Sequence, residues 1–302
     1  MKPKIILCMK VKLFILLCFL FVLGNQAVVA QERTVEPEVG EPAVLRMVYT
    51  FTQQAVKDRE SVYITDTMAL EVGMNGSVYY DWNKNRRDSL AAVRFTEPVN
   101  HKITVSVDEN ALQSRLEAQK QVYDVLDAGR GQSYRIYKKR DKEEVVTIDE
   151  GPLEGFDTET YFQLTENIPP QAWKMSGDTS TVLNYLCQKA SATFRGRTYV
   201  AWFTLDIPIN DGPWKFYGLP GLILKVQDTE GQFCWEVIGL QNVRDEILIP
   251  TDRKKIPCNL KELSDFKKNE RRYISVGFVE NGGVVYYRTK NPVTYFSLEK
   301  GD

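Results

Sequence analysis

The chain has 302 residues, of which 39 are Lys or Arg and 40 are Asp or Glu, so its formal net charge is −1. That balance excludes a strongly basic nucleic-acid binder and a polycationic membrane-surface protein. The single histidine, His101, excludes a metal site that needs two histidines and disfavours a relay of histidines. Hydrophobic residues at 43% and charged residues at 26% are ordinary for a globular protein.

The first 30 residues have the pattern of a secretory signal peptide. Four lysines and no acidic residue precede an unbroken apolar run, Leu13–Leu23, as in the two leading regions of such a signal. This run of 11 residues is shorter than the roughly 20 that a membrane-spanning helix needs. The small and apolar residues 28–30 form an acceptable cleavage site before Gln31. The sequence therefore predicts removal of residues 1–30 after Ala30.

An uncleaved N-terminal anchor is the alternative interpretation of the same segment. Cys18 lies inside the apolar run and follows Leu17. A lipoprotein signal would need a small residue directly before its cysteine, so we interpret Cys18 as part of the signal core and not as a lipidation site. No later segment is apolar enough to cross a membrane. We therefore expect a periplasmic or secreted protein with no membrane span after cleavage. Its remaining 35 basic and 40 acidic residues give a net charge of −5.

The rest of the chain is predicted to form one domain. Residues 31–42 are polar with two prolines and are expected to be a flexible lead-in. Beyond them the sequence shows no repeat, no low-complexity tract and no linker. We therefore expect a single β domain over residues 43–302.

Alternating side chains predict many short strands. Met47, Tyr49 and Phe51 share one face of a strand, because successive side chains of a strand point to opposite sides. Tyr199 begins a longer run, in which every second residue to Ile207 is apolar or small. Further β-type runs lie at 77–82, 134–137, 145–148, 222–226, 233–237, 274–278 and 284–287. Turn residues at 228–232 and 281–283 separate consecutive runs, which predicts hairpins.

Helices are expected at two places. Residues 108–121 are the best candidate, because Asp108 can cap a first turn and apolar residues return near helical spacing. Residues 122–126 either finish this helix or begin a strand. Residues 259–271 predict a short surface helix, whereas the polar residues 83–88 predict a loop. The pattern as a whole predicts a mainly β fold built on antiparallel sheet, with one or two short helices.

The search for catalytic motifs finds few candidates. There is no phosphate-binding glycine loop and no GxSxG motif, so no cofactor is predicted. His101 precedes an alternating run and is interpreted as a surface residue. Cys187, Cys234 and Cys258 remain after signal cleavage, and the sequence leaves open which pair, if any, forms a disulfide. Their spacing fits buried thiols better than a zinc site.

Acidic and aromatic residues offer the remaining chemistry. Carboxylates crowd residues 149–159, which are interpreted as a solvated loop. The alternatives are a carboxylate pair of a hydrolase or a weak calcium site. Trp202 and Trp214 are candidates to line a carbohydrate or apolar ligand site, with core packing as the alternative.

The densest segment is residues 195–228. Arg195-Gly196-Arg197 predicts a turn into a strand, and Pro208 is expected to end that strand because proline cannot donate to the ladder. Residues 219–222 fit a type II turn, in which Gly221 would take a positive φ. A β-branched residue at Gly221 is therefore expected to be costly.

This segment resembles the GLPGLI family through the hexapeptide Gly218, Leu219, Pro220, Gly221, Leu222 and Ile223. Further residues match the family pattern: Gln171, Trp173, Asp178-Thr179, Tyr185, Cys187, Lys189-Ala190, Phe194, Gly196-Arg197, Ala201-Trp202, Ile207-Pro208, Gly212-Pro213 and Lys215-Phe216. The resemblance covers about residues 45–300 and is strongest over 160–240. It implies a secreted or periplasmic protein of the Bacteroidetes lineage and no established activity.

The segment is also similar to the bowl-like N-terminal domain that precedes the catalytic domains of some bacterial peptide:N-glycanases. That similarity implies a curved antiparallel sheet, a bowl or half-barrel, without the catalytic part. The motif glycines and prolines carry over as turn formers. Arg197, Trp202, Trp214 and Lys215 are the candidates for ligand-facing residues.

Two functions follow as hypotheses. The first is a non-catalytic envelope protein that binds a partner protein, peptide, lipid or glycan on the curved sheet. The second is a carboxylate-dependent hydrolase acting on glycans or glycoproteins. A structural scaffold for other envelope proteins is a third interpretation, which predicts a large exposed apolar patch. No nucleic-acid partner is expected.

Overall fold

A computed structural model of the chain describes residues 38–86, 102–106, 131–151, 160–244, 246–249, 254–270, 273–280, 283–290 and 293–299. The predicted signal peptide, His101 and the predicted helix 108–121 lie outside these ranges. Among the residues described, no helix is long and apolar enough to span a membrane.

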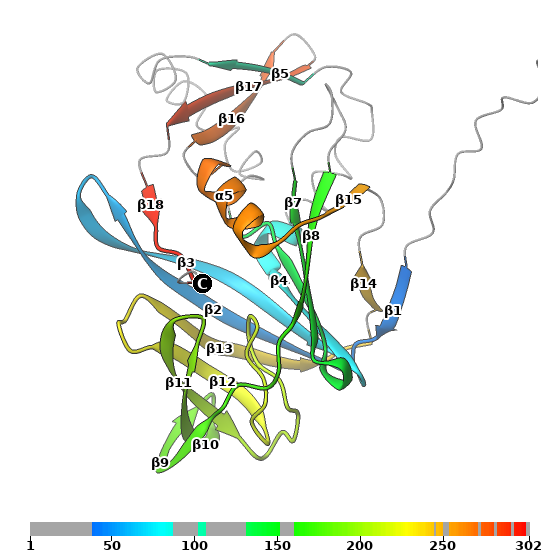
Figure 1. Cartoon of the computed structure of the whole chain (residues 1–302), viewed down its shortest axis with the longest axis vertical. Helices are drawn as coiled ribbons and strands as arrows, with labels where there is room; N and C mark the ends of the chain where they lie inside the picture. The colour runs from blue at the N-terminus through cyan, green and yellow to red at the C-terminus, as the bar shows by residue number, and fades with distance from the viewer. Residues whose placement is uncertain are drawn as a thin grey trace, which may run out of the picture. The chain divides into compact units, whose positions relative to one another are not determined.

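One large open sheet dominates the fold (Figure 1). Among the strands described, the two end strands, β15 and β9, do not pair with each other, so the sheet does not close on itself. The strands lie in the order β15 (Lys254–Pro257), β8 (Thr160–Asn167), β7 (Glu144–Glu150), β6 (Arg135–Lys139), β4 (Gly76–Asp81), β3 (Glu60–Val72), β2 (Leu45–Lys57), β13 (Phe233–Asn242), β12 (Leu222–Asp228), β11 (Arg197–Thr204), β10 (Tyr185–Phe194) and β9 (Lys174–Val182). A short strand, β18 (Val293–Tyr295), also pairs with β2. All neighbours are antiparallel except β15 and β8, which confirms the predicted mainly β, largely antiparallel fold.

Smaller elements accompany this sheet. β1 (Glu38–Pro42), at the end of the predicted lead-in, pairs with β14 (Glu246–Ile249). β16 (Tyr273–Glu280) and β17 (Gly283–Lys290) form the predicted antiparallel hairpin, and β5 (Lys102–Ser106) runs parallel to β17. The predicted C-terminal helix is confirmed as α5 (Leu260–Glu270), and Arg140–Lys142 form a single 3₁₀ turn. Residues 82–86 are helical, so the loop predicted from residue 83 is wrong there; Asp81 caps that turn through a bond of 2.7 Å from the Lys84 amide to its Oδ1.

Tight turns fix the register of three hairpins. Two residues with positive φ connect β2 to β3 (Asp58 and Arg59), and another two connect β9 to β10 (Leu183 and Asn184). The predicted turn before β11 is confirmed, with Arg195 at φ 49° and Gly196 at φ 71°. Two successive positive φ values are those of a type I′ turn, whose twist matches the flanking strands.

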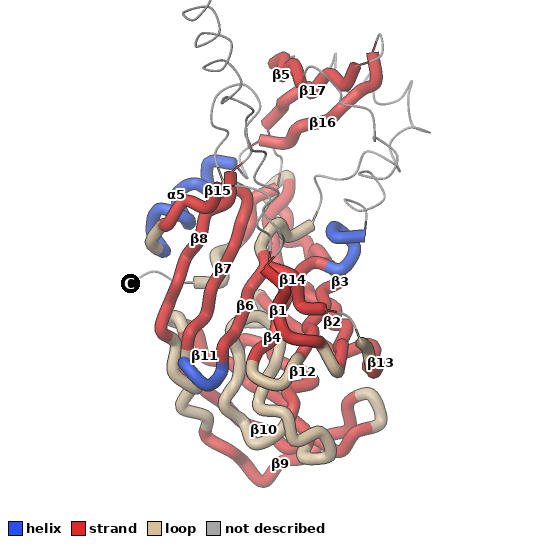
Figure 2. The backbone as a smooth tube through the Cα atoms, turned by 90° about the vertical axis from the view of Figure 1, so that its right-hand side faces the viewer, coloured by secondary structure: helices blue, strands red, loops and turns tan. Residues whose placement is uncertain are grey.

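β2 is the longest-paired strand and organises the sheet. Every second side chain of Met47–Ala55 is buried, as the predicted alternation requires. One edge of β2 pairs with β3 along its whole length. The other edge pairs with β13 over Leu45–Gln53 and with β18 over Ala55–Lys57. Figure 2 shows β6, β7 and β8 running side by side in the other half of the sheet.

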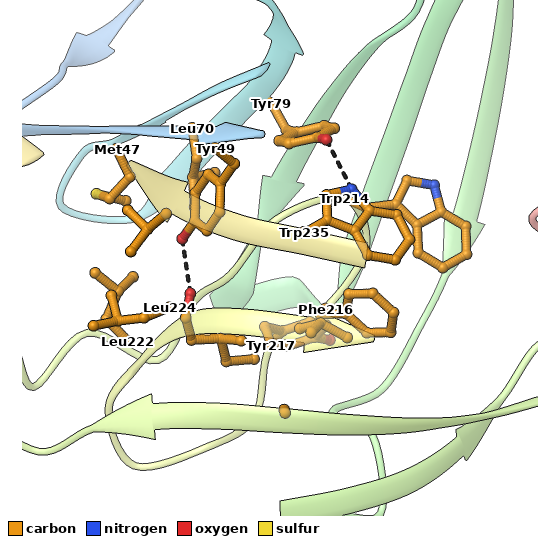
Figure 3. Packing of buried hydrophobic residues seen from close by; sticks show 14 of the residues in the cluster. Met47, Tyr49, Leu70, Tyr79, Trp214, Phe216, Tyr217, Leu222, Leu224 and Trp235 are labelled. Atoms are coloured by element: carbon orange, nitrogen blue, oxygen red, sulfur yellow. Dashed lines mark hydrogen bonds between the residues drawn. The ribbon is translucent and has the colours of Figure 1, made fainter. Parts of the chain in front are cut away.

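The sheet curves so that side chains of distant strands meet on its inner face. β4 and β13 are separated by two strands, which corresponds to about 14 Å in a flat sheet. Yet Trp235 Nε1 on β13 donates a hydrogen bond of 3.0 Å to the Tyr79 hydroxyl on β4 (Figure 3). Tyr49 on β2 likewise donates a bond of 2.7 Å to the Ile223 carbonyl on β12. These contacts place an aromatic core on the concave side.

The loop between β11 and β12, residues 205–221, fills much of that concave side. β11 ends at Thr204, three residues before Ile207, where the alternation predicted its end. Leu205 is 50% exposed. Trp214 and Phe216 are buried within the aromatic core. Trp214 stacks on Trp235 with ring centroids 6.0 Å apart and an interplanar angle of 13°. We call residues 205–221 the plug loop.

A buried ion cluster fastens the plug loop to β6. Asp211 is fully buried, and its two carboxylate oxygens bind Lys138 Nζ at 2.5 Å and Arg140 Nη1 at 2.6 Å. Lys138 also donates a bond of 2.5 Å to the Gly212 carbonyl. Burial lowers the pKa of Lys138, and the neighbouring Asp211 carboxylate opposes that shift. The loop therefore depends on a charge pair that water does not solvate.

The glycines of the hexapeptide act differently from the type II turn predicted for them. Gly218, not Gly221, has the positive φ, at 103°. Gly221 is instead required by a close approach of backbones, because a Cβ there would lie 1.9 Å from the Thr204 carbonyl oxygen. Chain crossing at the end of β11, and not a turn conformation, thus excludes a side chain at Gly221.

Substitution of Gly221 tests this close approach. Gly221→Ala should lower the free energy of unfolding by about 3 kcal/mol or more, because backbone must move to admit the methyl group. Gly177→Ala is the matched control, since a Cβ there meets nothing within 4 Å. It should change stability by less than about 0.5 kcal/mol. Urea denaturation of both variants measures the difference, and equal effects would contradict the crossing.

Breaking the Asp211 cluster should be asymmetric. Asp211→Asn leaves Lys138 buried without its counterion and should cost about 3–5 kcal/mol of unfolding free energy. Lys138→Met should cost less, because Asp211 keeps Arg140. A lysine with a lowered pKa binds fewer protons when folded than when unfolded, so the deficit of Asp211→Asn should shrink as pH rises from 7 to 9. Urea denaturation at pH 7 and pH 9 measures the unfolding free energy of both variants. A larger loss of stability in Lys138→Met than in Asp211→Asn would contradict this role of the cluster.

Candidate ligand-binding cavity

A cavity of about 810 Å³ lies against the inner face of the main sheet. Its walls come from β2, β6, β7 and β8, from the plug loop, from α5 and from residues 293–299. Its volume falls within the range of about 300–1,000 Å³ typical of small-molecule sites. Aromatic and aliphatic side chains alternate with a few polar ones around it: Tyr134, Leu164, Trp214, Leu263, Tyr295 and Phe296 are the larger apolar members.

Trp214 is held in an uncommon conformation at the cavity wall. Its φ is 51°, a left-handed value that a bulky residue rarely adopts, and its side chain is 3% exposed. The stack on Trp235 and edge contacts with Phe194 and Phe216 fix the ring. Such strain persists where the surroundings over-determine a conformation, and it is frequent at binding sites. The adjacent Lys215 lines the same cavity.

Four charged side chains form a cluster beside Trp214. Lys215 is 2% exposed, and its Nζ lies 2.5 Å from Glu166 Oε2 and 2.6 Å from Glu299 Oε1. Arg195 bonds to Glu166, and its Nε lies 3.8 Å from Glu299 Oε2. The cluster joins β8, the β10–β11 turn, the plug loop and the 293–299 segment. Two cations and two carboxylates make it neutral.

A second charged group lies where α5 meets the sheet. Lys267 Nζ on α5 contacts Asp149 Oδ2 at 3.0 Å and Ser133 Oγ at 2.6 Å. Asn259 starts the helix with a capping box, because its Oδ1 accepts from the Glu262 amide and its own amide donates to Glu262. Phe266 packs edge-on against Phe162 of β8. These contacts set α5 as one wall of the cavity.

The cavity wall includes a buried hydroxyl that makes no hydrogen bond among the residues described. Thr147 Oγ1 on β7 is buried and finds no hydrogen-bond partner among the residues described. A buried hydroxyl without a partner is uncommon and marks a place where a bound molecule can supply one. It lies on the same strand as Asp149, two residues away.

The four residues expected to face a ligand fall into two places. Trp214 and Lys215 line the cavity. Arg197 does not; it is buried at the β12–β13 turn, where Nη1 contacts Asp228 Oδ2 at 3.2 Å and Nη2 donates 2.8 Å to the Ser297 carbonyl. Trp202 lies half-buried outside the cavity, with Lys189 Nζ 5.8 Å from its ring centroid. The structure thus brings Trp214 and Lys215 together at the cavity, connects Arg197 to its wall through the Ser297 carbonyl, and leaves Trp202 outside.

The hexapeptide Gly218–Ile223 does not line the cavity, but it packs against and bonds to the loop that does. Gly218 packs closely on Pro170, with 2.7 Å from an added Cβ to the proline Cβ. Leu222 and Ile223 are fully buried at the start of β12. Their amides bond to the plug loop at the carbonyls of Ile207 and Asp211, both at 3.0 Å. The motif shapes and fastens the loop that carries Trp214.

The predicted acidic stretch contributes one residue to the cavity. Asp149 lines it, whereas Glu150 is half exposed and pairs with Lys84 at 3.1 Å. The other carboxylates of residues 152–159 lie outside the described ranges. Within the described part of the chain, no group of three or more His, Cys, Asp or Glu side chains is arranged to hold a metal ion.

Sequence reasoning missed the carboxylates that complete the site. Glu166 and Glu299 flank Lys215 although 133 positions separate them. Asp211 and Lys138 are 73 positions apart in sequence, yet their charged atoms lie 2.5 Å apart. The sequence around Lys138 gave no signal of this pair, because the neighbouring Arg135, Lys139 and Arg140 make it look like part of a solvated basic strand.

All three described cysteines carry free thiols. Burial raises the pKa of Cys187 and Cys234, and it raises that of Cys258 to about 11, with Glu262 and Asp149 adding to the shift. A raised pKa suppresses the thiolate, which is the reactive form. These residues are therefore poor nucleophiles.

Alkylation by iodoacetamide tests this inertness. At pH 8 a thiol with a pKa of about 11 is about 0.1% ionised, against roughly a quarter for an ordinary cysteine. Native Cys258 should therefore react more than about a hundredfold slower than the same residue in urea, and its rate should rise up to pH 11. Mass spectrometry of labelled peptides gives both rates, and fast native labelling at pH 8 would contradict the prediction.

A family model described as a protein of unknown function (Porph_ging) matches residues 194–225. This span runs from the end of β10 through the plug loop into β12. No curated protein matches the chain.

Two solved structures of PNGF-II are similar to the chain. The structure in space group P21 aligns with a TM-score of 0.46 and 13% identity, over 78% of this chain and 35% of PNGF-II. The structure in space group C2 gives a TM-score of 0.45 with the same identity and coverage. The chain thus spans about a third of the length of these proteins.

Proposed function

We propose that the protein is an exported, non-catalytic binding protein of the GLPGLI family that takes its ligand in the cavity beside Trp214 and Lys215. The cavity itself carries the proposal: it has a suitable volume, mostly apolar walls and a few polar groups that can orient a ligand. The N-terminal signal pattern supports export to the periplasm or beyond. The hexapeptide and the family match over the same segment support the family assignment.

The arrangement of charge favours binding over turnover. Both carboxylates that line the cavity and have described surroundings, Asp149 and Glu299, are already bonded to a lysine, Lys267 and Lys215 respectively. Burial raises the pKa of all three cysteines, which suppresses the reactive thiolate. Trp214 offers a fixed aromatic surface, and Thr147 offers a hydroxyl without a partner in the described residues. These are features that hold a molecule in place.

Native mass spectrometry of the full chain, purified without denaturation from its own host, tests the proposal. The wild type should carry a reproducible additional mass, and Trp214→Leu should lose it because the aromatic wall is removed. Trp202→Leu is the matched control: it removes the half-buried tryptophan outside the cavity and should keep the mass. Circular dichroism establishes that both variants fold. Loss in Trp202→Leu with retention in Trp214→Leu would overturn the assignment of the cavity.

A carboxylate-dependent hydrolase acting on glycans or glycoproteins is the second candidate. The observation in its favour is that Asp149 and Glu299 share one cavity. It requires turnover of a glycan or glycopeptide substrate that Asp149→Asn abolishes while the fold is retained.

A further inference from the structure

Residues 293–299 occupy the inner side of the sheet in the manner of a bound peptide. Val293–Tyr295 add to the free edge of β2 as β18, where Thr294 lies opposite Val56. Residues 296–299 then leave the sheet and run along the cavity, and all seven residues line it. Strand addition followed by side-chain anchors is a common mode of peptide recognition.

Three kinds of anchor hold this segment. Phe296 and Leu298 pack against the aromatic core. The Ser297 carbonyl accepts a bond of 2.8 Å from Arg197 Nη2. The Glu299 carboxylate lies at 2.6 Å from Lys215 Nζ and faces Arg195. The anchors thus bind two apolar side chains, one backbone carbonyl and one negative charge.

The anchors are buried more deeply than the segment itself. Arg197 and Lys215 are 4% and 2% exposed, whereas none of residues 293–299 is fully buried. Glu299 Oε2 is buried yet makes no hydrogen bond within the described residues. A cavity of about 810 Å³ also remains beside the segment. The segment therefore uses the site without filling it.

Charge argues for an acidic occupant. Lys215 and Arg195 face two carboxylates, Glu166 on β8 and Glu299 on the segment. If the segment leaves, Glu299 leaves with it. Lys215 and Arg195 then have Glu166 as the remaining carboxylate of the cluster, so the cluster carries a net charge of +1 in a buried place. Such a site attracts another carboxylate strongly, since removing one member of a buried ion pair is costly.

We infer that segment 293–299 is a displaceable stand-in for an extended peptide ligand, which adds to the edge of β2 and presents apolar side chains where Phe296 and Leu298 lie and a carboxylate where Glu299 lies. This inference rests on the proposed ligand-binding function of the cavity and names its ligand class. The ligand peptide replaces the segment, makes the same bonds to Arg197 and Lys215, and extends into the remaining volume.

Binding of a synthetic peptide with the sequence of residues 290–300 to the full-length protein tests the inference. The protein carries Glu299→Gln, which weakens its own segment. Fluorescence anisotropy should show binding at least about tenfold tighter than to the wild type, because the internal competitor has lost its charge-assisted bond. A peptide with Glu299→Gln should bind about tenfold more weakly than the native peptide. A peptide of the same composition in scrambled order is the control and should bind at least about tenfold more weakly than the native peptide, since it cannot place the two apolar side chains and the carboxylate together.

A disulfide lock provides the decisive comparison. Val56→Cys with Thr294→Cys joins directly opposite residues of β2 and β18. The oxidised protein should not bind the peptide, and dithiothreitol should restore binding. Equal binding by the oxidised and reduced proteins, or no binding by either the reduced protein or Glu299→Gln, overturns the inference. A co-purified mass that depends on Trp214 in the same preparations would leave the proposed function standing, so the two failures are distinguishable.

Discussion

The buried carboxylate of Asp211 is the constraint on which the concave side of the sheet depends. It is fully buried and is neutralised by Lys138 and Arg140, both from the β6–3₁₀ segment. The chain from β11 to β12 must therefore cross the inner face to reach these cations. Since a buried charge without partners is costly, the position of the loop is specified by electrostatics as well as by apolar packing.

The candidate site follows from that crossing. Once Asp211 is fixed, Gly212 and Pro213 turn the chain so that Trp214 enters the aromatic core and Lys215 reaches Glu166. The positive φ of Trp214 is sustained by the ring contacts around it. Gly221 then lets the loop leave across the Thr204 carbonyl. The recognisable hexapeptide is thus the exit of the plug loop, and the residues that face the cavity precede it.

Sequence patterns predicted the strands well where burial alternates. Met47–Phe51 and Phe233–Val237 show a period of two because one face of each strand is packed. The hairpin turns at Arg195-Gly196 and 228–232 were visible because turn chemistry is local. The helical turn at 82–86 was missed because its cap, Asp81, is also the last residue of a strand. The need for glycine at position 221 was predicted, but for the wrong reason. A close approach of two backbone segments has the same sequence signal as a turn that requires a positive φ.

The site was only half predictable for a related reason. Trp214 and Lys215 are neighbours in sequence and were found together, whereas Glu166, Arg195 and Glu299 reach the same point from three separate elements. Ion pairs of this kind have no sequence spacing, because they are made by the fold. Arg197 and Trp202 were grouped with Trp214 by proximity in the chain, but Trp202 is half-buried outside the cavity, and Arg197 reaches the cavity wall only through the Ser297 carbonyl.

The two charged clusters have different consequences for what the protein can do. The Asp211 cluster is closed: both of its cations come from one segment and no cavity adjoins the carboxylate in the residues that line the site. The Lys215 cluster borders the cavity, and one of its carboxylates belongs to a segment that is partly exposed along its length. The fold needs the Asp211–Lys138 pair for its shape, whereas the Glu299–Lys215 pair is the one that a ligand carboxylate can replace in the proposed function. In the proposed function, stability depends on Asp211 and recognition on the position of Glu299, and both carboxylates contact cations in or against the same loop.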